Sequence, residues 1–430
     1  MIKNNGKFEA DSVQTGSSGE VDLTGSRDFL TTETTERVLA ALLAPGSTIK
    51  RIKFSTKSFG RDAAAVAAKA LKNVSATLTD ADISDVIAGR PEDEALDALR
   101  AISAALVPAR LARLNLSDNA LGEKGVRACA DVLTSQPALE SLSLQNVGCS
   151  INACRAVAEL VTKSQDLRQL HLFNNMSDNE GAGYMASILA RAPRMEDFRM
   201  ASSRVGPQGG MALCQALCTG RSLVRLDVSD NPMTEEVAPA LAALIRAQPG
   251  LKALNLNDTS LTNDGAVVVA LALAEGAPAL EELGLALNEI TAAGAKAVAV
   301  AVAGKAHLAR LNLRENELED RGAVIIARAV EKVATLRTLD LCGNQIKRVG
   351  AVAAAKAAAS RPHLELLALD ENMVSEAGLD EVRAVMAGAG KAGALGPLDD
   401  NMEEDDEELE EEDDEDDSGL SALMAKAGLA

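Results

Sequence analysis

The 430-residue chain has few aromatic side chains and few cysteines: no tryptophan, one tyrosine, six phenylalanines and six cysteines. The cysteines show no Cys-x-x-Cys spacing and no disulfide framework, a pattern that suits a reducing compartment. Cys214 and Cys218 lie four residues apart on one expected helix, where burial as small apolar residues is favoured over metal binding. The three histidines are scattered, so the sequence supports neither a metal site nor a Ser/His/Asp triad.

Three further absences narrow the function. No apolar run approaches the roughly 18–20 residues of a membrane helix, and residues 1–6 are too polar to open a signal peptide, so we expect no membrane contact. No GxxxxGK[ST] phosphate loop occurs, so we expect no nucleotide bound by that route. The net charge is −20 and no basic stripe exists, so nucleic acid is disfavoured as a partner.

What the chain has is a repeat. The pattern Leu-x-Leu-x-x-Asn-x-Leu places its Asn position at 119, 147, 175, 203, 231, 259, 288, 316, 344 and 372, with eight gaps of 28 and one of 29. An alanine-rich stretch with helical spacing follows each copy. The pattern predicts an α/β fold: a leucine-rich-repeat solenoid (horseshoe) of about twelve 28-residue strand-helix repeats, similar in period to ribonuclease inhibitor. The residue between the two leucines should line the concave wall.

The consensus Asn should turn the chain after each strand, because its side-chain amide can satisfy backbone groups that the turn leaves unpaired. Val147, Ser203 and Thr259 replace it in three copies, so we expect less regular turns there. Glycines keep the same register along the repeats. This register favours a close approach between neighbouring repeats, where a Cβ would not fit.

The pattern also predicts the organisation of the chain. We expect a flexible N-terminal segment over residues 1–26, a capping helix over 27–48, the leucine-rich-repeat domain over 49–388 and a linker over 389–398. Residues 399–417 hold 16 acidic side chains and no base, which leaves a charge of about −4 on the other 411 residues. Such a run cannot bury apolar area and predicts a disordered acidic tail, either solubilising or attracting a basic partner. Residues 418–430 form a short C-terminal segment.

The 28-residue period is interrupted markedly once, and the inserted residues include an arginine. Two weaker copies are anchored near Lys57 and Val86, and the gap from Val86 to Asn119 is 33 residues, five longer than the period. The extra residues fall within 87–92 and include Arg90. A solenoid tolerates insertions on one face, which is often its binding face. The residues alone therefore predict a protein-interaction scaffold with Arg90 on an inserted loop.

Specific strings add a resemblance. DISDVIAGRPEDEAL at 82–96 resembles the arginine loop of the Ran GTPase-activating proteins. LNLSDNALGEKG at 114–125, FNNM at 173–176 and PLDDN at 397–401, just before the acidic run, resemble the plant-type branch of that family. The resemblance covers about residues 28 to 417. Residues 1–26 are too short and too polar to match the N-terminal nuclear-envelope targeting domain of that branch.

The resemblance implies an enzyme activator rather than an enzyme. Such a protein binds the small GTPase Ran in its GTP form and stimulates GTP hydrolysis by ordering the catalytic glutamine of the GTPase, in support of nucleocytoplasmic transport. GTP and Mg²⁺ belong to the partner, so no cofactor is expected. Ran-binding or transport factors are further expected partners, and the chain is expected to be a monomer. The expected location is cytoplasmic, or perinuclear within the cytoplasm.

The resemblance also implies two catalytic residues. Arg90 matches the family's loop arginine, either as an arginine finger or as an organiser of the loop. Asn146 matches the position whose Asn holds the GTPase's glutamine, and because Val147 occupies the consensus position, Asn146 is an amide additional to the structural one. Three residues just after their strands are expected to bind the partner: Asp118, Asn174 and Arg204.

Two other classes of function remain open. A non-catalytic leucine-rich-repeat scaffold or inhibitor would resemble ribonuclease inhibitor, although that family alternates its unit lengths and is richer in Cys and Trp. An acidic-tailed histone-binding protein of the nuclear phosphoprotein type would have shorter and fewer repeats.

Overall fold

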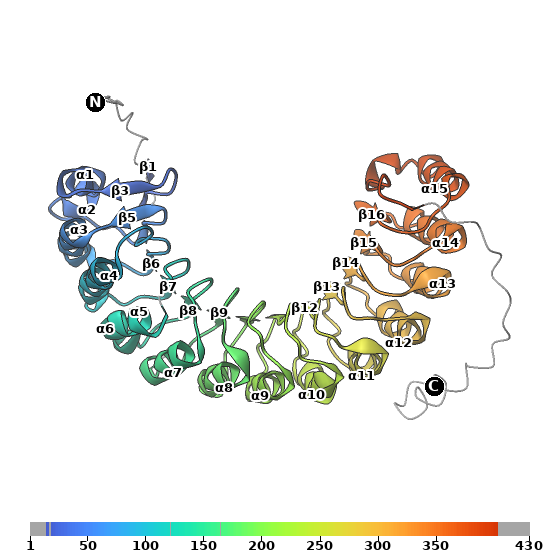
Figure 1. Cartoon of the computed structure of the whole chain (residues 1–430), viewed down its shortest axis with the longest axis horizontal. Coiled ribbons are helices and arrows are strands. Elements are labelled where there is room, and N and C mark those ends of the chain that lie inside the picture. Colours follow the sequence, from blue (N-terminus) through green and yellow to red (C-terminus); the bar gives the residue numbers. More distant parts are fainter. Residues whose placement is uncertain (1–13, 17–18, 121, 164, 403–430) are drawn as a thin grey trace. The chain divides into compact units, whose positions relative to one another are not determined.

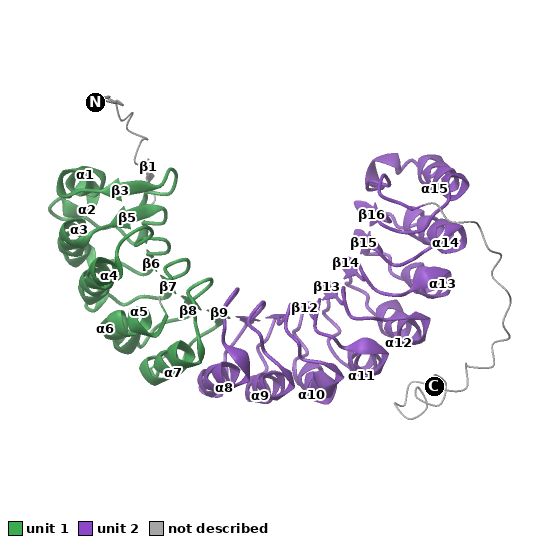
Figure 2. Cartoon of the chain, viewed as in Figure 1, with its two compact units in different colours: residues 1–170 green, residues 171–430 purple. Residues whose placement is uncertain are grey.

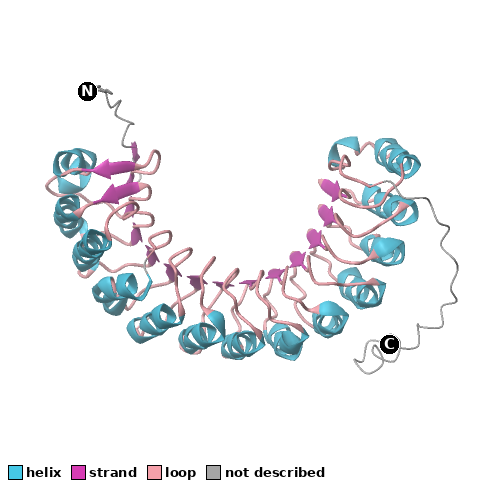
Figure 3. Ribbon diagram, viewed as in Figure 1, coloured by secondary structure: helices cyan, strands magenta, loops and turns pink. Residues whose placement is uncertain are grey.

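The computed structural model describes residues 14–16, 19–120, 122–163 and 165–402. The chain divides into two compact units, residues 1–170 and 171–430 (Figure 2). Each unit stacks strand–loop–helix repeats, with its parallel strands on one side and its helices on the other (Figures 1 and 3). The predicted leucine-rich-repeat solenoid is confirmed. Residues 403–430, where most of the acidic tail and the short C-terminal segment are predicted, lie outside the described residues.

The main sheet of the first unit consists of three-residue strands that run parallel, except that β1 pairs antiparallel with β2. Across the sheet they are β1 (Gln14–Gly16), β2 (Glu20–Asp22), β4 (Arg51–Lys53), β6 (Asp80–Asp82), β7 (Arg113–Asn115) and β8 (Ser141–Ser143). The helices are α1 (Thr32–Val38), α2 (Ala40–Leu43), α3 (Arg61–Val74), α4 (Glu92–Leu106), α5 (Gly122–Ala128), α6 (Ala130–Ser135) and α7 (Ile151–Leu160). Strand β9 (Gln169–His171) spans the boundary between the units.

A second, two-stranded parallel sheet was not predicted. It pairs β3 (Asp28–Leu30) with β5 (Lys57–Phe59), with Phe29 opposite Ser58. Where the sequence predicts a capping helix over 27–48, the structure has β3 followed by the short helices α1 and α2. A capping box starts α1, because the Thr31 and Thr34 hydroxyls each accept the other residue's backbone N–H. Strands β1 and β2 likewise lie within residues 1–26, where the sequence predicts a flexible segment.

The second unit continues the same repeat, with parallel strands of three residues. They are β10 (Asp197–Arg199), β11 (Arg225–Asp227), β12 (Ala253–Asn255), β13 (Glu282–Gly284), β14 (Arg310–Asn312), β15 (Thr338–Asp340) and β16 (Leu366–Ala368). The helices are α8 (Asp178–Leu189), α9 (Pro207–Leu217), α10 (Ala238–Ala247), α11 (Thr262–Glu275), α12 (Ala292–Ala303), α13 (Glu319–Val330), α14 (Arg348–Ala359) and α15 (Glu376–Gly388), with short 3₁₀ turns η1 (Glu235–Val237) and η2 (Ala392–Ala394). None of the described helices has the length and apolar character needed to cross a membrane.

Consensus asparagines satisfy backbone groups at the turns, as the sequence predicts, and they also join neighbouring repeats. Asn316 is buried, and its Nδ2 donates to the Leu313 carbonyl at 2.9 Å and to the Leu285 carbonyl of the preceding repeat at 3.0 Å. Its Oδ1 accepts the N–H groups of Asn288 and Ile290, both at 3.0 Å. One side chain thus satisfies backbone groups in two repeats.

The replaced positions make fewer such bonds. The Thr259 hydroxyl donates to the Leu256 carbonyl at 2.7 Å, and the Ser203 hydroxyl donates to the Ala201 carbonyl at 2.9 Å. Neither side chain can offer the two N–H donors of an amide. Burial within the repeats raises the pKa of the Cys129 and Cys214 thiols to about 12. Those cysteines therefore remain protonated, as small apolar residues should.

The C-terminal end of the second unit extends beyond the predicted repeats. Leu395 pairs with Leu367 of β16, and Asn401 takes the place of a consensus Asn, since its Oδ1 accepts the Asn372 N–H at 3.2 Å. Leu398 is buried. The predicted linker 389–398 and the first residues of the predicted tail therefore pack on the last repeat. The spacing shows why: Asn401 follows Asn372 by 29 residues.

Candidate functional site

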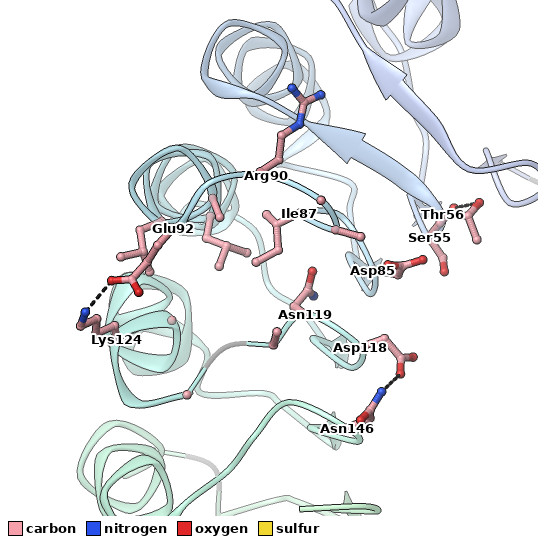
Figure 4. A pocket seen from close by; sticks show the side chains of 18 of the residues that line it. Ser55, Thr56, Asp85, Ile87, Arg90, Glu92, Asp118, Asn119, Lys124 and Asn146 are labelled. Carbon is pink, nitrogen blue, oxygen red and sulfur yellow. Dashed lines mark hydrogen bonds and ion pairs between the residues drawn. The ribbon is translucent and has the colours of Figure 1, made fainter.

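A cavity of about 1020 Å³ lies in the first unit. Its wall is made by the connections that follow four strands, β4, β6, β7 and β8, and by the first turns of α4 and α5 (Figure 4). Thr56, Asp85, Asp118 and Asn146 each come from one of these connections. The insertion predicted from the 33-residue gap lies in the wall, at residues 87–90.

Three Asp or Asn residues of this wall share a left-handed backbone. Asp85 (φ 48°), Asp118 (φ 60°) and Asn146 (φ 51°) each precede a consensus position of the repeat. Aspartate and asparagine tolerate this conformation better than other non-glycine residues. The residue type at 146 therefore has a backbone explanation in addition to the functional one that the resemblance implies.

The side chains of Asp118 and Asn146 lie side by side at the exposed end of the wall (Figure 4). Asn146 Nδ2 donates to Asp118 Oδ1 at 3.1 Å, which joins two successive repeats. A primary amide both donates and accepts hydrogen bonds, whereas a carboxylate only accepts them. The pair therefore places an amide and a carboxylate together at the exposed end of the wall.

The Arg90 side chain is bound by neighbouring residues and does not project into the cavity. Its Nε donates to Ser58 Oγ at 3.0 Å, one Nη donates to the Ser58 carbonyl at 2.8 Å, and the other lies 3.6 Å from Glu94 Oε1. The Phe29 ring stacks on the guanidinium, with 5.0 Å between its centroid and Arg90 Cζ. The side chain is only 16% exposed and points away from the cavity (Figure 4). This geometry fits a loop organiser better than an arginine finger.

Ion pairs flank the cavity on two sides. Arg27 pairs with Asp85, and Lys124 pairs with Glu92. The hydrogen bond from Lys124 to Glu92 raises the pKa of the Lys124 ammonium above its ordinary value, so Lys124 stays charged. The lining also includes apolar side chains, those of Ile87, Ala95, Leu96 and Leu99.

Asn174 and Arg204, the other predicted partner-binding residues, belong to the second unit. Both have a left-handed backbone, with φ of 53° and 58°. Two exposed apolar side chains, Phe173 and Met176, flank Asn174. The structure therefore brings Arg90, Asp118 and Asn146 to one cavity in the first unit.

Sequence reasoning missed one residue of the cavity wall, Asp85, and two residues that hold the Arg90 loop, Phe29 and Ser58. Asp85 precedes Val86 as Asp118 precedes Asn119, so the register of the repeat could have identified it. Phe29 and Ser58 gave no such signal, because the second sheet that carries them does not follow the repeat. Among the described residues, no group of three His, Cys, Asp or Glu side chains could hold a metal ion.

Comparisons with known proteins agree with this fold. The family model described as leucine-rich repeat matches residues 278–299 and 304–327. RAN GTPase-activating protein 1 of Arabidopsis thaliana is 44% identical over 142 residues, which are 32% of this chain and 26% of that protein. RAN GTPase-activating protein 2 of the same plant is 48% identical over 118 residues, 27% of this chain and 22% of that protein. A ribonuclease inhibitor of Mus musculus is 29% identical over 160 residues, 36% of this chain and 35% of that protein.

The matched segments cover only about a quarter of the length of either plant relative. The resemblance to plant Ran GTPase-activating proteins, which short strings of the sequence indicate, is confirmed as sequence similarity over more than a hundred residues.

Proposed function

We propose that this chain is a GTPase-activating protein that binds Ran in its GTP form and stimulates hydrolysis of the bound GTP. The observation that carries the proposal is the identity of 44% and 48% to two plant proteins whose names state this activity. The cavity in the first unit supports it, because the residues that match the family's arginine loop and asparagine lie on one wall.

The mechanism follows from what a slow GTPase lacks. A GTPase hydrolyses slowly when its catalytic glutamine does not hold the attacking water firmly. In this proposal, Asn146 donates to or accepts from the carboxamide of that glutamine and so orders it. Asp118, 3.1 Å from Asn146 Nδ2, fixes the asparagine beforehand. A complete helper of the Ras type accelerates hydrolysis roughly 10⁵-fold, which corresponds to about 7 kcal/mol of barrier.

Arg90 has a different role in this proposal. Its guanidinium is already bound to Ser58 and stacked on Phe29, so it shapes the loop rather than reaching the phosphate. Breaking these contacts to free an arginine finger would cost several hydrogen bonds at once. Asp118, Asn174 and Arg204 contact the GTPase, each from a turn that follows its strand.

The remaining features of the proposal concern the cell. GTP and Mg²⁺ come with the partner, so the activator itself carries no cofactor. The protein works as a cytoplasmic monomer, or at a perinuclear site, and supports nucleocytoplasmic transport together with Ran-binding or transport factors. The six cysteines, none of them in a disulfide, agree with a reducing compartment.

The test is single-turnover GTP hydrolysis by Ran with and without catalytic amounts of this chain. We expect acceleration by several orders of magnitude, because an ordered glutamine and a dry interface act on the chemical step itself. A double variant, Arg90→Ala with Asn146→Gly, removes both proposed site residues. It should lose most of the stimulation, while its circular dichroism spectrum stays that of the wild type. No acceleration by the folded wild-type chain would contradict the proposal.

A second candidate is a non-catalytic inhibitor or scaffold. The observation that favours it is the similarity to a mouse ribonuclease inhibitor. Inhibition of a ribonuclease by this chain, with no effect on Ran, would identify this function instead.

A further inference from the structure

The loop that carries Arg90 is held by the second sheet as well as by its own repeat. Ala88, Gly89 and Arg90 each contact that sheet. Ser58 Oγ donates to the Ala88 carbonyl at 2.8 Å and accepts a hydrogen bond from Arg90 Nε at 3.0 Å. Ser58 is completely buried, so the hydroxyl has a fixed position from which it holds both residues.

Phe29 holds the other side of the loop. Its ring stacks on the Arg90 guanidinium, 5.0 Å from centroid to Cζ, which is within the range of a cation–π contact. Gly89 has a φ of +73°, and a Cβ at this residue would lie 2.8 Å from Phe29 Cζ. The edge of the ring therefore packs directly against the Gly89 backbone. A side chain at 89 would displace the ring.

Strand pairing places these two contacts together. Phe29 lies opposite Ser58 in the register of β3 and β5, so one rung of the sheet carries both the ring and the hydroxyl. Lys57 fixes β3 at its start, because its buried ammonium donates to the Ser26 carbonyl at 2.6 Å and to Asp28 Oδ2 at 2.8 Å. The N-terminal segment is thus anchored where it meets the loop.

Core packing does not account for Phe29. The residue is 56% exposed, whereas Phe54 and Phe59 are fully buried. Neither Phe29 nor Ser58 lines the cavity. Phe29 leaves half of its surface exposed and covers Gly89 and Arg90. Its contacts with the loop therefore explain its position.

We propose that Phe29 is a positioning residue for the loop 87–90, and that the N-terminal strand β3 thereby sets the shape of the cavity wall that meets the GTPase. This inference rests on the proposed function. The ring acts on the loop before the partner binds. Without the ring, a smaller fraction of molecules has the loop in the conformation that binds the GTPase. The apparent affinity for Ran-GTP falls in proportion to that fraction.

The experiment compares Phe29→Ala and Phe29→Leu with the wild-type chain by two readouts. The first is hydrogen exchange of the backbone amides of residues 87–90 in the chain alone. The second is single-turnover hydrolysis by Ran-GTP, titrated with activator. Val349→Ala in the second unit, which also truncates an exposed apolar side chain, is the control.

We expect Phe29→Ala to speed exchange at residues 87–90 and to raise the half-maximal activator concentration about tenfold, with the rate at saturation within about twofold of the wild type. Phe29→Leu, which keeps an apolar side chain beside Gly89 but removes the aromatic face from Arg90, should give a smaller change in both readouts, and Val349→Ala should change neither. Unchanged exchange with a weakened affinity would make Phe29 a direct partner contact and overturn the proposal. A lowered melting temperature with unchanged exchange and unchanged affinity would also overturn it.

The two proposals fail separately. If the wild-type chain does not stimulate Ran, the proposed function is contradicted, while the exchange measurement still decides whether Phe29 holds the loop.

Discussion

At the scale of single residues, the position before each consensus Asn combines two demands. At Asp85, Asp118 and Asn146 this position has a left-handed backbone, and each of the three residues lines the cavity. Aspartate and asparagine satisfy the backbone at low cost and also carry hydrogen-bonding groups. The same residue type can therefore serve the fold and the site, and a substitution must separate the two roles.

Asn146→Gly makes this separation. Glycine keeps the left-handed turn without strain, while the amide that would order the partner's glutamine is removed. We expect the single-turnover rate at saturating activator to fall about 10²-fold, in line with the loss of one preorganised donor, with the free energy of unfolding changed by no more than about 1 kcal/mol. Urea denaturation checks the second value. Full stimulation by Asn146→Gly would show that the asparagine serves the turn only.

At the scale of the element, the buried asparagine is what joins one strand–turn–helix unit to the next. The Leu-x-Leu spacing and the asparagine could be recognised from sequence, because both depend on local periodicity. The second sheet could not be recognised, because neither β3 nor β5 carries the Leu-x-Leu pattern of the repeat. For the same reason the prediction of one capping helix is wrong, since Thr31 starts α1 only after a strand.

Asn316→Ala tests the joining role. The substitution leaves the Leu285 carbonyl and the Asn288 and Ile290 N–H groups without this partner, whereas the Leu313 carbonyl keeps its hydrogen bond from Asn344 Nδ2 at 2.9 Å. Unsatisfied buried groups cost about 1–3 kcal/mol each, partly offset by water and relaxation, so we expect a loss of roughly 3 kcal/mol in urea denaturation. The adjacent exposed residue provides the control: Glu317→Ala should stay within about 0.5 kcal/mol. Equal effects of the two substitutions would refute the joining role.

At the scale of the whole molecule, each repeat packs on its neighbours, so the last ones need closing. Residues 392–402 close the second unit, through the Leu395–Leu367 bridge, buried Leu398 and Asn401. The acidic run begins at Asp399 and therefore overlaps the closing segment by its first residues. The charge pattern alone places the start of the acidic tail too early, at Asp399, because Asp399 and Asp400 belong to a folded turn.

Two truncations test this closure. Removal of residues 403–430 should leave the melting temperature within about 1 °C of the full chain, because the closing contacts stay in place. Removal of residues 392–430 exposes the last strand and should cost about 2 kcal/mol or more, which lowers the melting temperature by several degrees. Asn401→Ala in the chain that ends at 402 should give an intermediate value. Equal melting temperatures for both truncations would show that residues 392–402 do not close the fold.

The leucine-rich-repeat fold, its register and the location of the insertion all follow from the amino-acid sequence, because each depends on a period that is written along the chain. The same period places Asp118 and Asn146 at corresponding ends of successive strands, and the insertion places Arg90 in the connection that follows the preceding strand, β6. The directions of the side chains, in contrast, depend on the tertiary structure. Arg90 turns from the cavity to Ser58 and Phe29, since hydrogen-bond acceptors and an aromatic face are available there. Those partners lie on strands whose pairing is set by long-range contacts, which no local pattern records.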